Sequence, residues 1–193
     1  AAEQLADAGI AVAVFDAMPS LGRKFLRAGI GGLNLTHSEA SEQFPLRYAD
    51  RQTEISNLLA SFGATELRAW CEALGIETFV GSSGRVFPKE MKAAPLLRKW
   101  LSRLRSKGVT FNTRHRWCGW EAEGSHCFDT PAGKVRIDAD AVVFALGGAS
   151  WSALGTDGRW AVPFAERGLQ CIPFKPSNGG FLYDWREDFK RDY

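Results

Sequence analysis

The segment from Leu21 to His37 constrains the fold of this chain most, because it combines glycines with cations directly after a short apolar run. The run from Ala11 to Phe15 ends on Asp16. The segment then holds four glycines and three cations: Gly22, Gly29, Gly31, Gly32, Arg23, Lys24 and Arg27. Glycine allows close approach of the backbone and positive φ, while successive N–H groups and cations favour phosphate. The pattern predicts a loop that holds a dinucleotide, with a flavin preferred.

Composition narrows the class of protein. The chain has 193 residues and a formal charge of +2, which gives no reason to expect a nucleic-acid partner. It has no apolar run of about 18 residues and no secretory leader, so we expect a cytoplasmic protein without a membrane span. The four cysteines lack C-x-x-C or metal-ligand spacing, which disfavours a metal site and a dithiol active site and fits a reducing compartment. They are Cys71, Cys118, Cys127 and Cys171.

Hydrophobic patterning predicts an α/β fold. We expect helices over 1–8, 54–62, 65–74, 95–107 and 157–167, and strands over 11–16, 78–80, 85–87, 109–112, 141–146 and 169–172. Residues 18–37 read as a glycine loop, 38–50 as irregular, and 116–138 as an antiparallel meander. The runs 11–16 and 141–146 are apolar enough for a buried parallel sheet, with helices on one face and the meander on the other.

The start of the chain reads as the body of a helix that closes at Gly9. In a dinucleotide-binding βαβ unit, an acid such as Asp16 lies about 20 residues after a G-x-G-x-x-G turn. We therefore expect a fragment whose first strand and glycine fingerprint lie upstream, and which by itself binds FAD weakly or not at all. Residues 1–173 are expected to form an incomplete Rossmann-like FAD-binding domain, and 174–193 the start of a second or inserted domain.

Three motifs, in order, resemble one family. GRKFLRAGIGGLNLTHSE, GRVFPKEMKAAPLL and VVFALGGASWSALGTDG are similar to motifs of the BaiN-like flavoproteins, bacterial NAD(P)/FAD-dependent oxidoreductases of the two-dinucleotide-binding-domain group. The resemblance extends from Ala1 to about Phe181. Family members continue at both ends, with the first strand, an inserted domain and a final flavin-contacting segment.

The resemblance implies a set of cofactor-binding residues. Asp16 would accept hydrogen bonds from the adenosine ribose, although it could instead cap the turn after its strand. Other matching positions are Gly22, Arg23 and Lys24 beside the diphosphate; Gly29, Gly31, Gly32, Asn34 and Thr36 along the ribityl chain and flavin; Trp117 beside adenine, or in the core; and Ala145, Leu146, Gly147 and Gly148 in a second flavin motif. The chain departs from the family at Ile30, Gly32 and Leu33, which removes charge beside the flavin. Asp157 is preferred as a helix N-cap.

The activity that the resemblance implies is an FAD-dependent oxidoreductase. NAD(P)H would reduce the flavin, which would pass electrons to a small organic acceptor. His37, Arg85 and Lys89 are candidates for contacts to the substrate or pyridine nucleotide; no catalytic residue, metal or oligomeric state is assigned. Three alternatives remain: a flavin- or nucleotide-binding module without turnover, an RNA-modifying flavoprotein, which the near-neutral charge disfavours, and an NAD-only Rossmann enzyme, which the meander disfavours.

Overall fold

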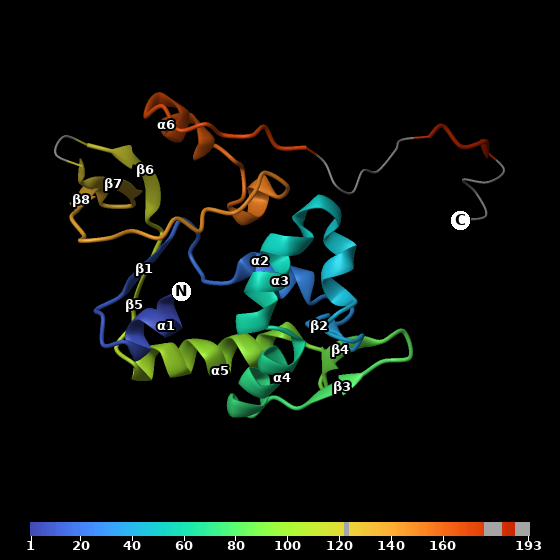
Figure 1. The fold of residues 1–193 in the computed structure, drawn as a ribbon. Coiled ribbons are helices and arrows are strands. Elements are labelled where there is room, and N and C mark those ends of the chain that lie inside the picture. Colours follow the sequence, from blue (N-terminus) through green and yellow to red (C-terminus); the bar gives the residue numbers. More distant parts are fainter. Residues whose placement is uncertain (122–123, 176–182, 188–193) are drawn as a thin grey trace.

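Strands β1 (Ala13–Asp16) and β5 (Thr110–Thr113) form a parallel pair at the centre of the fold, with Ala13 opposite Thr110 (Figure 1). The computed structural model describes residues 1–121, 124–175 and 183–187. Two antiparallel sheets accompany this pair, in the orders β2-β4-β3 and β6-β7-β8. Their strands are β2 (Thr36–His37), β3 (Thr78–Val80), β4 (Arg85–Pro88), β6 (Arg116–Trp120), β7 (His126–Thr130) and β8 (Gly133–Ile137).

Six α-helices and two 3-10 segments lie among the remaining described residues. They are α1 (Ala2–Asp7), α2 (Arg23–Ala28), α3 (Gln52–Ser61), α4 (Ala64–Ala73), α5 (Ala93–Ser106) and α6 (Ala161–Glu166), with 3-10 turns η1 (Phe44–Arg51) and η3 (Ser152–Leu154). The periodicity of the sequence predicted α1, α3, α4 and α5 to within a few residues. The α/β class is confirmed.

The parallel pair has different cover on its two faces. On one face, Phe15 of β1 stacks on Phe128 of β7, with ring centroids 4.7 Å apart. On the other, the guanidinium of Arg105 in α5 lies 5.3 Å from the centre of the Phe111 ring in β5. Neighbouring residues of a strand point to opposite faces, and Phe111 pairs with Val14 rather than Phe15. The helix and the meander therefore cover opposite faces, as the sequence predicted.

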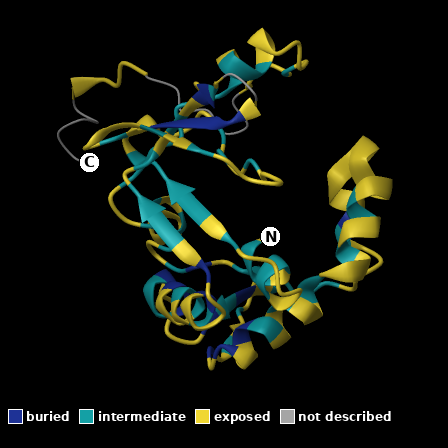
Figure 2. Ribbon diagram, turned by 90° about the vertical axis from the view of Figure 1, so that its left-hand side faces the viewer, coloured by how far each residue is buried: buried dark blue, intermediate teal, exposed yellow. Residues whose placement is uncertain are grey.

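Helix α5 organises the core. Leu96, Leu97 and Leu104 are buried along it, and both α1 and α2 contact it. Figure 2 shows the buried residues between the helices and in the meander, while α3 is largely exposed. The main apolar cluster joins α4, α5 and the end of the glycine segment: Leu33, Cys71, Leu74, Ile76, Ala93 and Leu96.

The carboxylate of Glu3 attaches α1 to this core. Its Oε2 accepts hydrogen bonds from the indole N–H groups of Trp70, at 3.1 Å, and Trp100, at 3.0 Å. Its Oε1 lies 2.8 Å from Nε of Arg103. The two indole rings meet edge to face at 5.2 Å. One partly buried carboxylate thus joins α1, α4 and α5.

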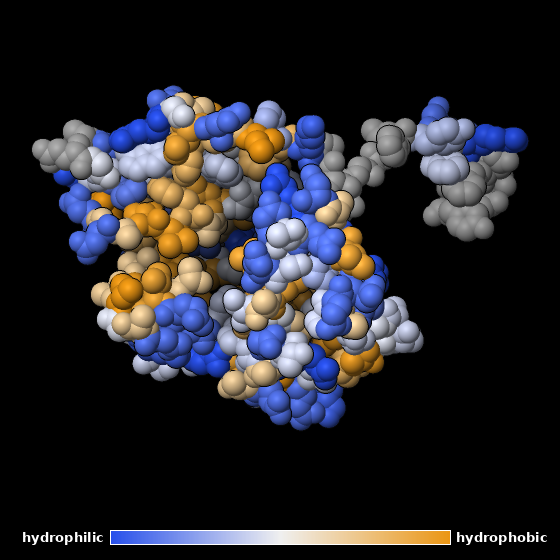
Figure 3. Space-filling model, viewed as in Figure 1, coloured by the Kyte–Doolittle hydropathy of each residue, from blue (hydrophilic) through white to orange (hydrophobic). Residues whose placement is uncertain are grey.

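Two predicted strands are wrong. Residues 141–146 and 169–172 form no strand, and Val142 and Val143 are 42% and 62% exposed. A strand needs a hydrogen-bonded neighbour, and within the described residues β1 pairs with β5 alone. An apolar sequence favours a strand but cannot supply that neighbour. Among the described residues, the segment that follows β8 therefore has no strand partner, and its Phe144 packs instead against Trp117 and Trp120 of the meander. Figure 3 shows much hydrophobic area on the side of the molecule where the meander lies.

The expectation of irregular structure across 18–50 is also wrong in part. Residues 23–28 form α2 because Arg, Lys, Phe, Leu and Ala favour helix, and the glycines flank the helix rather than interrupt it. Gly22 takes the left-handed conformation at its start, with φ of 68°. Residues 44–51 form the 3-10 segment η1. Among the described residues, no helix has the length and apolar character needed to cross a membrane.

Candidate functional site

The predicted glycine segment packs its helix tightly on α5. A Cβ added at Gly22 would lie 2.7 Å from Cδ2 of Leu97, and one at Gly29 would lie 2.4 Å from Cβ of Ala93. Both distances are shorter than any ordinary carbon–carbon contact of about 3.5–4.0 Å. These two glycines therefore have a packing role in the structure, whether or not they also contact a cofactor.

Arg23, the first residue of α2, has a buried polar atom without a partner. Its Nε is excluded from solvent and forms no hydrogen bond with any residue that the structure describes. A buried donor on a cation is costly unless it is hydrogen bonded, and anionic oxygen is its strongest acceptor. This atom is the feature of the glycine segment that most directly fits a missing anionic group.

Lys24 connects the two predicted cofactor segments. Its Nζ donates a hydrogen bond of 2.9 Å to Oγ of Ser150, which follows the second glycine motif. One turn later in α2, the guanidinium of Arg27 lies 5.2 Å from the centre of the Trp151 ring. The structure thus brings residues 22–32 and 147–151 together, although more than a hundred residues separate them in the sequence.

An open pocket of about 330 Å³ lies where these segments meet. It is lined by Lys24, Arg27, Ala28, Ile30, Trp151 and Leu154. Two cations and an indole face therefore border one hollow. Of these residues the sequence singled out only Lys24 as a site residue; the position of Ser150 and Trp151 directly after the second glycine motif was the available signal.

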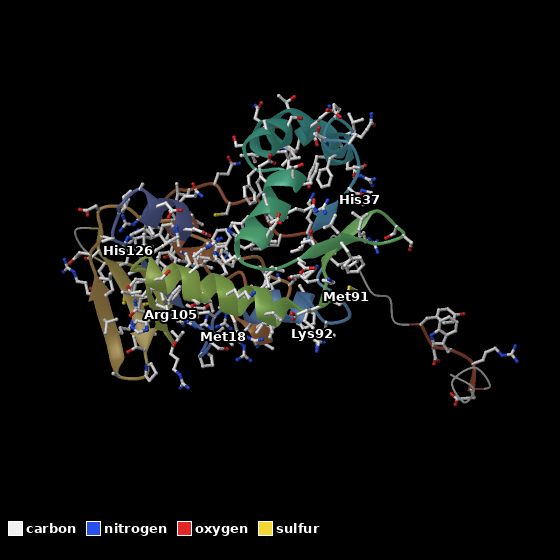
Figure 4. All side chains as sticks on the ribbon, turned by 90° about the horizontal axis from the view of Figure 1, so that it is seen from below. Met18, His37, Met91, Lys92, Arg105 and His126 are labelled. Carbon is white, nitrogen blue, oxygen red and sulfur yellow. The ribbon has the colours of Figure 1, made fainter. Side chains whose placement is uncertain are left out.

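The remaining predicted cofactor residues of the glycine segment, from Gly31 to Thr36, differ from one another in how open they are to a ligand. Gly31 has φ of 84°, and an added Cβ would meet no atom of the described structure within 4 Å, so its backbone is open to a ligand. Gly32, with φ of 128°, lies against Met91, whose Cε would be 2.7 Å from an added Cβ. Asn34 is exposed, and Thr36 pairs with Val86 in the small sheet. Figure 4 labels Met91 at the turn before α5.

Asp16 already has one partner. Its Oδ1 accepts a hydrogen bond of 2.8 Å from the backbone N–H of Met18, which caps the turn after β1. The second carboxylate oxygen has no hydrogen-bond partner among the described residues, so a ribose contact remains a prediction. Both readings of this acid are therefore compatible with the geometry.

The second glycine motif is held by its own loop. The indole N–H of Trp160 donates to the carbonyl of Gly147 at 2.9 Å, and Gly147 has φ of 76°. Ala145 is exposed, while Leu146 and Gly148 are half-buried. A Cβ at Gly147 would lie 2.8 Å from Cγ2 of Thr156, whereas one at Gly148 would meet nothing within 4 Å in the described structure. Gly148 thus has open space on the side where a side chain would project, whereas Gly147 is exposed but has Thr156 on that side.

Comparison with known proteins identifies the family of this chain. Residues 1–183 match the family described as HI0933-like protein Rossmann domain. The chain belongs to the HI0933-like family. It is also 29% identical, over 174 residues, to a 3-dehydro-bile acid delta(4,6)-reductase of Clostridium scindens (strain ATCC 35704 / DSM 5676 / VPI 13733 / 19). That alignment covers 89% of this chain and 41% of the reductase, so the chain spans less than half the length of that relative.

In this member of the HI0933-like family, none of the three substrate candidates lines the pocket: His37 and Arg85 lie in the small sheet, and Lys89 lies in the turn directly after β4. His37 pairs with Arg85 across β2 and β4. Both imidazole nitrogens of His37 are engaged: Nδ1 accepts from the backbone of Glu39 at 3.1 Å, and Nε2 lies 3.0 Å from the carbonyl of Ser83. Lys89 forms a 2.7 Å ion pair with Glu77. Figure 4 shows His37 at the opposite end of the molecule from His126 in the meander.

Trp117 belongs to an aromatic cluster between the meander and α6. Its ring lies 4.8 Å from Trp120, 5.0 Å from Phe144 and 5.7 Å from Phe164. Its indole N–H donates to Nδ1 of His126 at 3.3 Å. Burial, and secondarily the positive charge of Arg167, lowers the pKa of His126, which therefore stays neutral as an acceptor. The half-buried side chain of Trp117 thus packs within this aromatic cluster, and the predicted backbone contact to adenine remains a prediction.

Two further expectations concern the role of Asp157 and metal-binding groups. Asp157 is not a helix N-cap, because Trp160 occupies that position of α6. Instead its Oδ1 accepts from the backbone N–H of Arg159, and its Oδ2 lies 3.2 Å from Nη1 of Arg116. These contacts lower the pKa of Asp157 against the opposing effect of burial, the largest single influence. Over the described residues, no group of three or more His, Cys, Asp or Glu side chains has the arrangement of a metal site.

Proposed function

We propose that this chain is the FAD-binding part of a flavin-dependent oxidoreductase that uses NAD(P)H as electron donor and a small organic molecule as acceptor. Membership of the HI0933-like family supports this, and so does the similarity to a bile-acid reductase. The small net charge of +2 favours a small-molecule acceptor over a nucleic acid. Residues 1–173 would form the cofactor domain, and 174–193, most of which lie outside the described residues, would begin an inserted or second domain.

The observation that carries the proposal is the buried, unpartnered Nε of Arg23. It lies at the start of α2, next to Lys24, which reaches across to Ser150. A diphosphate would give the Arg23 guanidinium an anionic acceptor and would place a second cation beside the same charge. The residues present therefore fit the phosphate part of a dinucleotide.

Each surrounding residue has a distinct task in this proposal. Arg23 and Lys24 neutralise the diphosphate, and the exposed backbone at Gly31 lets the cofactor approach without a side chain in the way. Asp16 accepts from a ribose hydroxyl through the oxygen that Met18 leaves free. Trp151 and Ile30 border the open pocket and would give a bound cofactor apolar contacts there. The flavin, when bound, supplies two-electron transfer between the donor and the acceptor.

The test is the visible absorbance of the full-length gene product that contains this chain, before and after anaerobic addition of NADPH or NADH. We expect a bound flavin whose oxidised absorbance disappears on reduction. A colourless protein that FAD cannot reconstitute would refute the proposal. A bound flavin that neither nucleotide reduces would favour a binding module without turnover.

A pair of variants tests the residue assignment. Arg23→Gln removes the charge at the proposed diphosphate site, and we expect FAD affinity to fall about tenfold to a hundredfold, the value of one charge-assisted hydrogen bond. Arg98→Gln removes an exposed cation on α5 and should leave FAD affinity unchanged. Equal affinities for both variants would show that Arg23 does not hold the cofactor.

A further inference from the structure

The pairing of β6 with β7 contains a bulge that places two cysteines next to each other. Trp117 pairs with Phe128 and Gly119 with Cys127, so Cys118 is an extra residue in β6. Cys118 and Gly119 together oppose Cys127. Gly119 has no side chain to separate the two thiols, and its φ of 129° is one that glycine adopts without strain.

The strand register places the side chains of Cys118 and Cys127 at adjacent positions of the two paired strands. Hydrogen bonding with the side chain of Cys118 is the largest influence on the pKa of the Cys127 thiol, and Glu121 acts in the same direction. These interactions and burial raise the pKa of the Cys127 thiol to about 12, against the weaker opposing effect of Lys134. Cys127 therefore keeps its proton at neutral pH.

The pair is accessible from one side. Cys118 is exposed and Cys127 is buried, so a reagent in solution reaches the Cys118 sulfur first. The other two cysteines lie elsewhere: Cys71 is buried in α4, and the thiol of Cys171 faces the carbonyl of Ala161. The sequence suggested four scattered cysteines because it shows no C-x-x-C. The bulge brings together two that are nine residues apart.

We propose that Cys118 and Cys127 are a redox modification site, which a peroxide converts from two thiols to a disulfide. Opposed residues of an antiparallel pair have Cα atoms about 4.5–5.5 Å apart, within the range that a disulfide spans. This inference does not depend on the proposed cofactor.

The chemistry is that of a stepwise two-electron oxidation. The Cys118 thiolate attacks one oxygen of hydrogen peroxide, the O–O bond breaks, and the protonated leaving oxygen departs as water. Cys118 is then a sulfenic acid. The Cys127 sulfur attacks the Cys118 sulfur, the S–O bond breaks, and the departing hydroxide takes the proton of Cys127 as water. Two thiols and one peroxide give one disulfide and two waters, with both electrons passed to the peroxide.

The consequence is a covalent link across the first hairpin of the meander. The link would fix the bulge beside Trp117 and the aromatic cluster around it. It would form without a change of strand register, because the present register already sets Cys118 and Gly119 opposite Cys127.

The experiment treats the purified protein with hydrogen peroxide, blocks remaining thiols with iodoacetamide and maps the peptides without reduction. Cleavage after Glu121 separates the two cysteines, so the two pieces stay together only if a disulfide joins them. We expect two of the four free thiols to disappear, the joined pieces to contain Cys118 and Cys127, and dithiothreitol to release them. Continued alkylation of both cysteines, or pairing of Cys118 with any other cysteine, would overturn the proposal.

Matched variants separate the pair from general oxidation. Cys118→Ser should prevent the crosslink, with Cys127 recovered as an unoxidised thiol. Cys171→Ser removes a cysteine outside the pair and should leave the crosslink at the wild-type yield. A crosslink that survives Cys118→Ser would refute the assignment. The wild-type peptide map decides the question by itself if a variant fails to fold.

Discussion

The contact between Gly29 and Ala93 gives a sharp test of why the first glycine motif contains glycine. In Gly29→Ala, the new Cβ would lie 2.4 Å from Cβ of Ala93 and 3.2 Å from its backbone nitrogen. Gly29 has φ of −86°, so the backbone accepts alanine and the cost comes from packing alone. Both clashing atoms are rigid, and α2 must move away from α5 by about 1 Å to reach normal contact at about 3.5 Å.

Overpacking of this kind costs about 1–3 kcal/mol. We expect Gly29→Ala to lower the free energy of unfolding by about 2 kcal/mol and the melting temperature by about 4–8 °C. The assay is urea denaturation followed by far-ultraviolet circular dichroism, with the m-value checked for two-state behaviour.

A double-mutant cycle identifies the cause. Ala93→Gly removes the opposing methyl group, so the double variant should recover most of the loss caused by Gly29→Ala. Gly31→Ala is the control: it has a strained φ of 84° but open space, so its cost of about 1–2 kcal/mol should not change with Ala93→Gly. The reasoning is refuted if Gly29→Ala is as stable as the wild type, or if the Gly29 and Ala93 effects simply add.

Three further outcomes are expected. Glu3→Ala should lower the free energy of unfolding, measured by urea denaturation, by about 2–4 kcal/mol, because two indole donors and Arg103 lose their acceptor. In the same assay the control Glu72→Ala, at an exposed position, should change this free energy by less than about 0.5 kcal/mol. Folding lowers the pKa of His126, so below about pH 6.5 the unfolded chain binds more protons and the free energy of unfolding should fall as the pH falls. His126→Asn keeps an acceptor for Trp117 and should make the free energy of unfolding depend less on pH. If that pH dependence is unchanged in the variant, His126 is not its source. Asp16→Ala should lower the free energy of unfolding by about 1 kcal/mol, because the backbone N–H of Met18 loses its acceptor, and should weaken FAD binding to the full-length product. If a fluorescence titration gives an unchanged FAD affinity, the role of Asp16 is limited to the turn after β1.

Sequence patterns predicted the elements whose signals are local. Helix α5 and the meander follow from apolar periodicity and turn residues, which neighbouring positions determine. The run 141–146 has an equally strong apolar signal but forms no strand, because a strand depends on a partner elsewhere. Helix α2 was missed because glycines at its two ends read as a continuous loop.

The candidate site was predictable only in part, because its motifs are local in the sequence whereas their meeting depends on tertiary contacts. The two glycine motifs were visible in the sequence, but their meeting through Lys24 and Ser150 is a tertiary contact that spacing cannot reveal. The burial of Nε of Arg23 likewise appears only once α2 is packed. The adjacency of Cys118 and Cys127 depends on a bulge, which shifts register by one residue and leaves no signature of its own in the sequence.

The parallel pair of β1 and β5 has a consequence for amide hydrogen exchange. Successive amides of a strand point to opposite edges, and within the described chain β1 has a paired strand at one edge. We therefore expect alternate amides of this four-residue strand to differ sharply in protection, with those toward β5 exchanging slowly and the others near the rate of an open chain. Any strand that docks on the free edge would abolish this alternation, so the exchange pattern of β1 measures how complete the central sheet is in a given form of the protein.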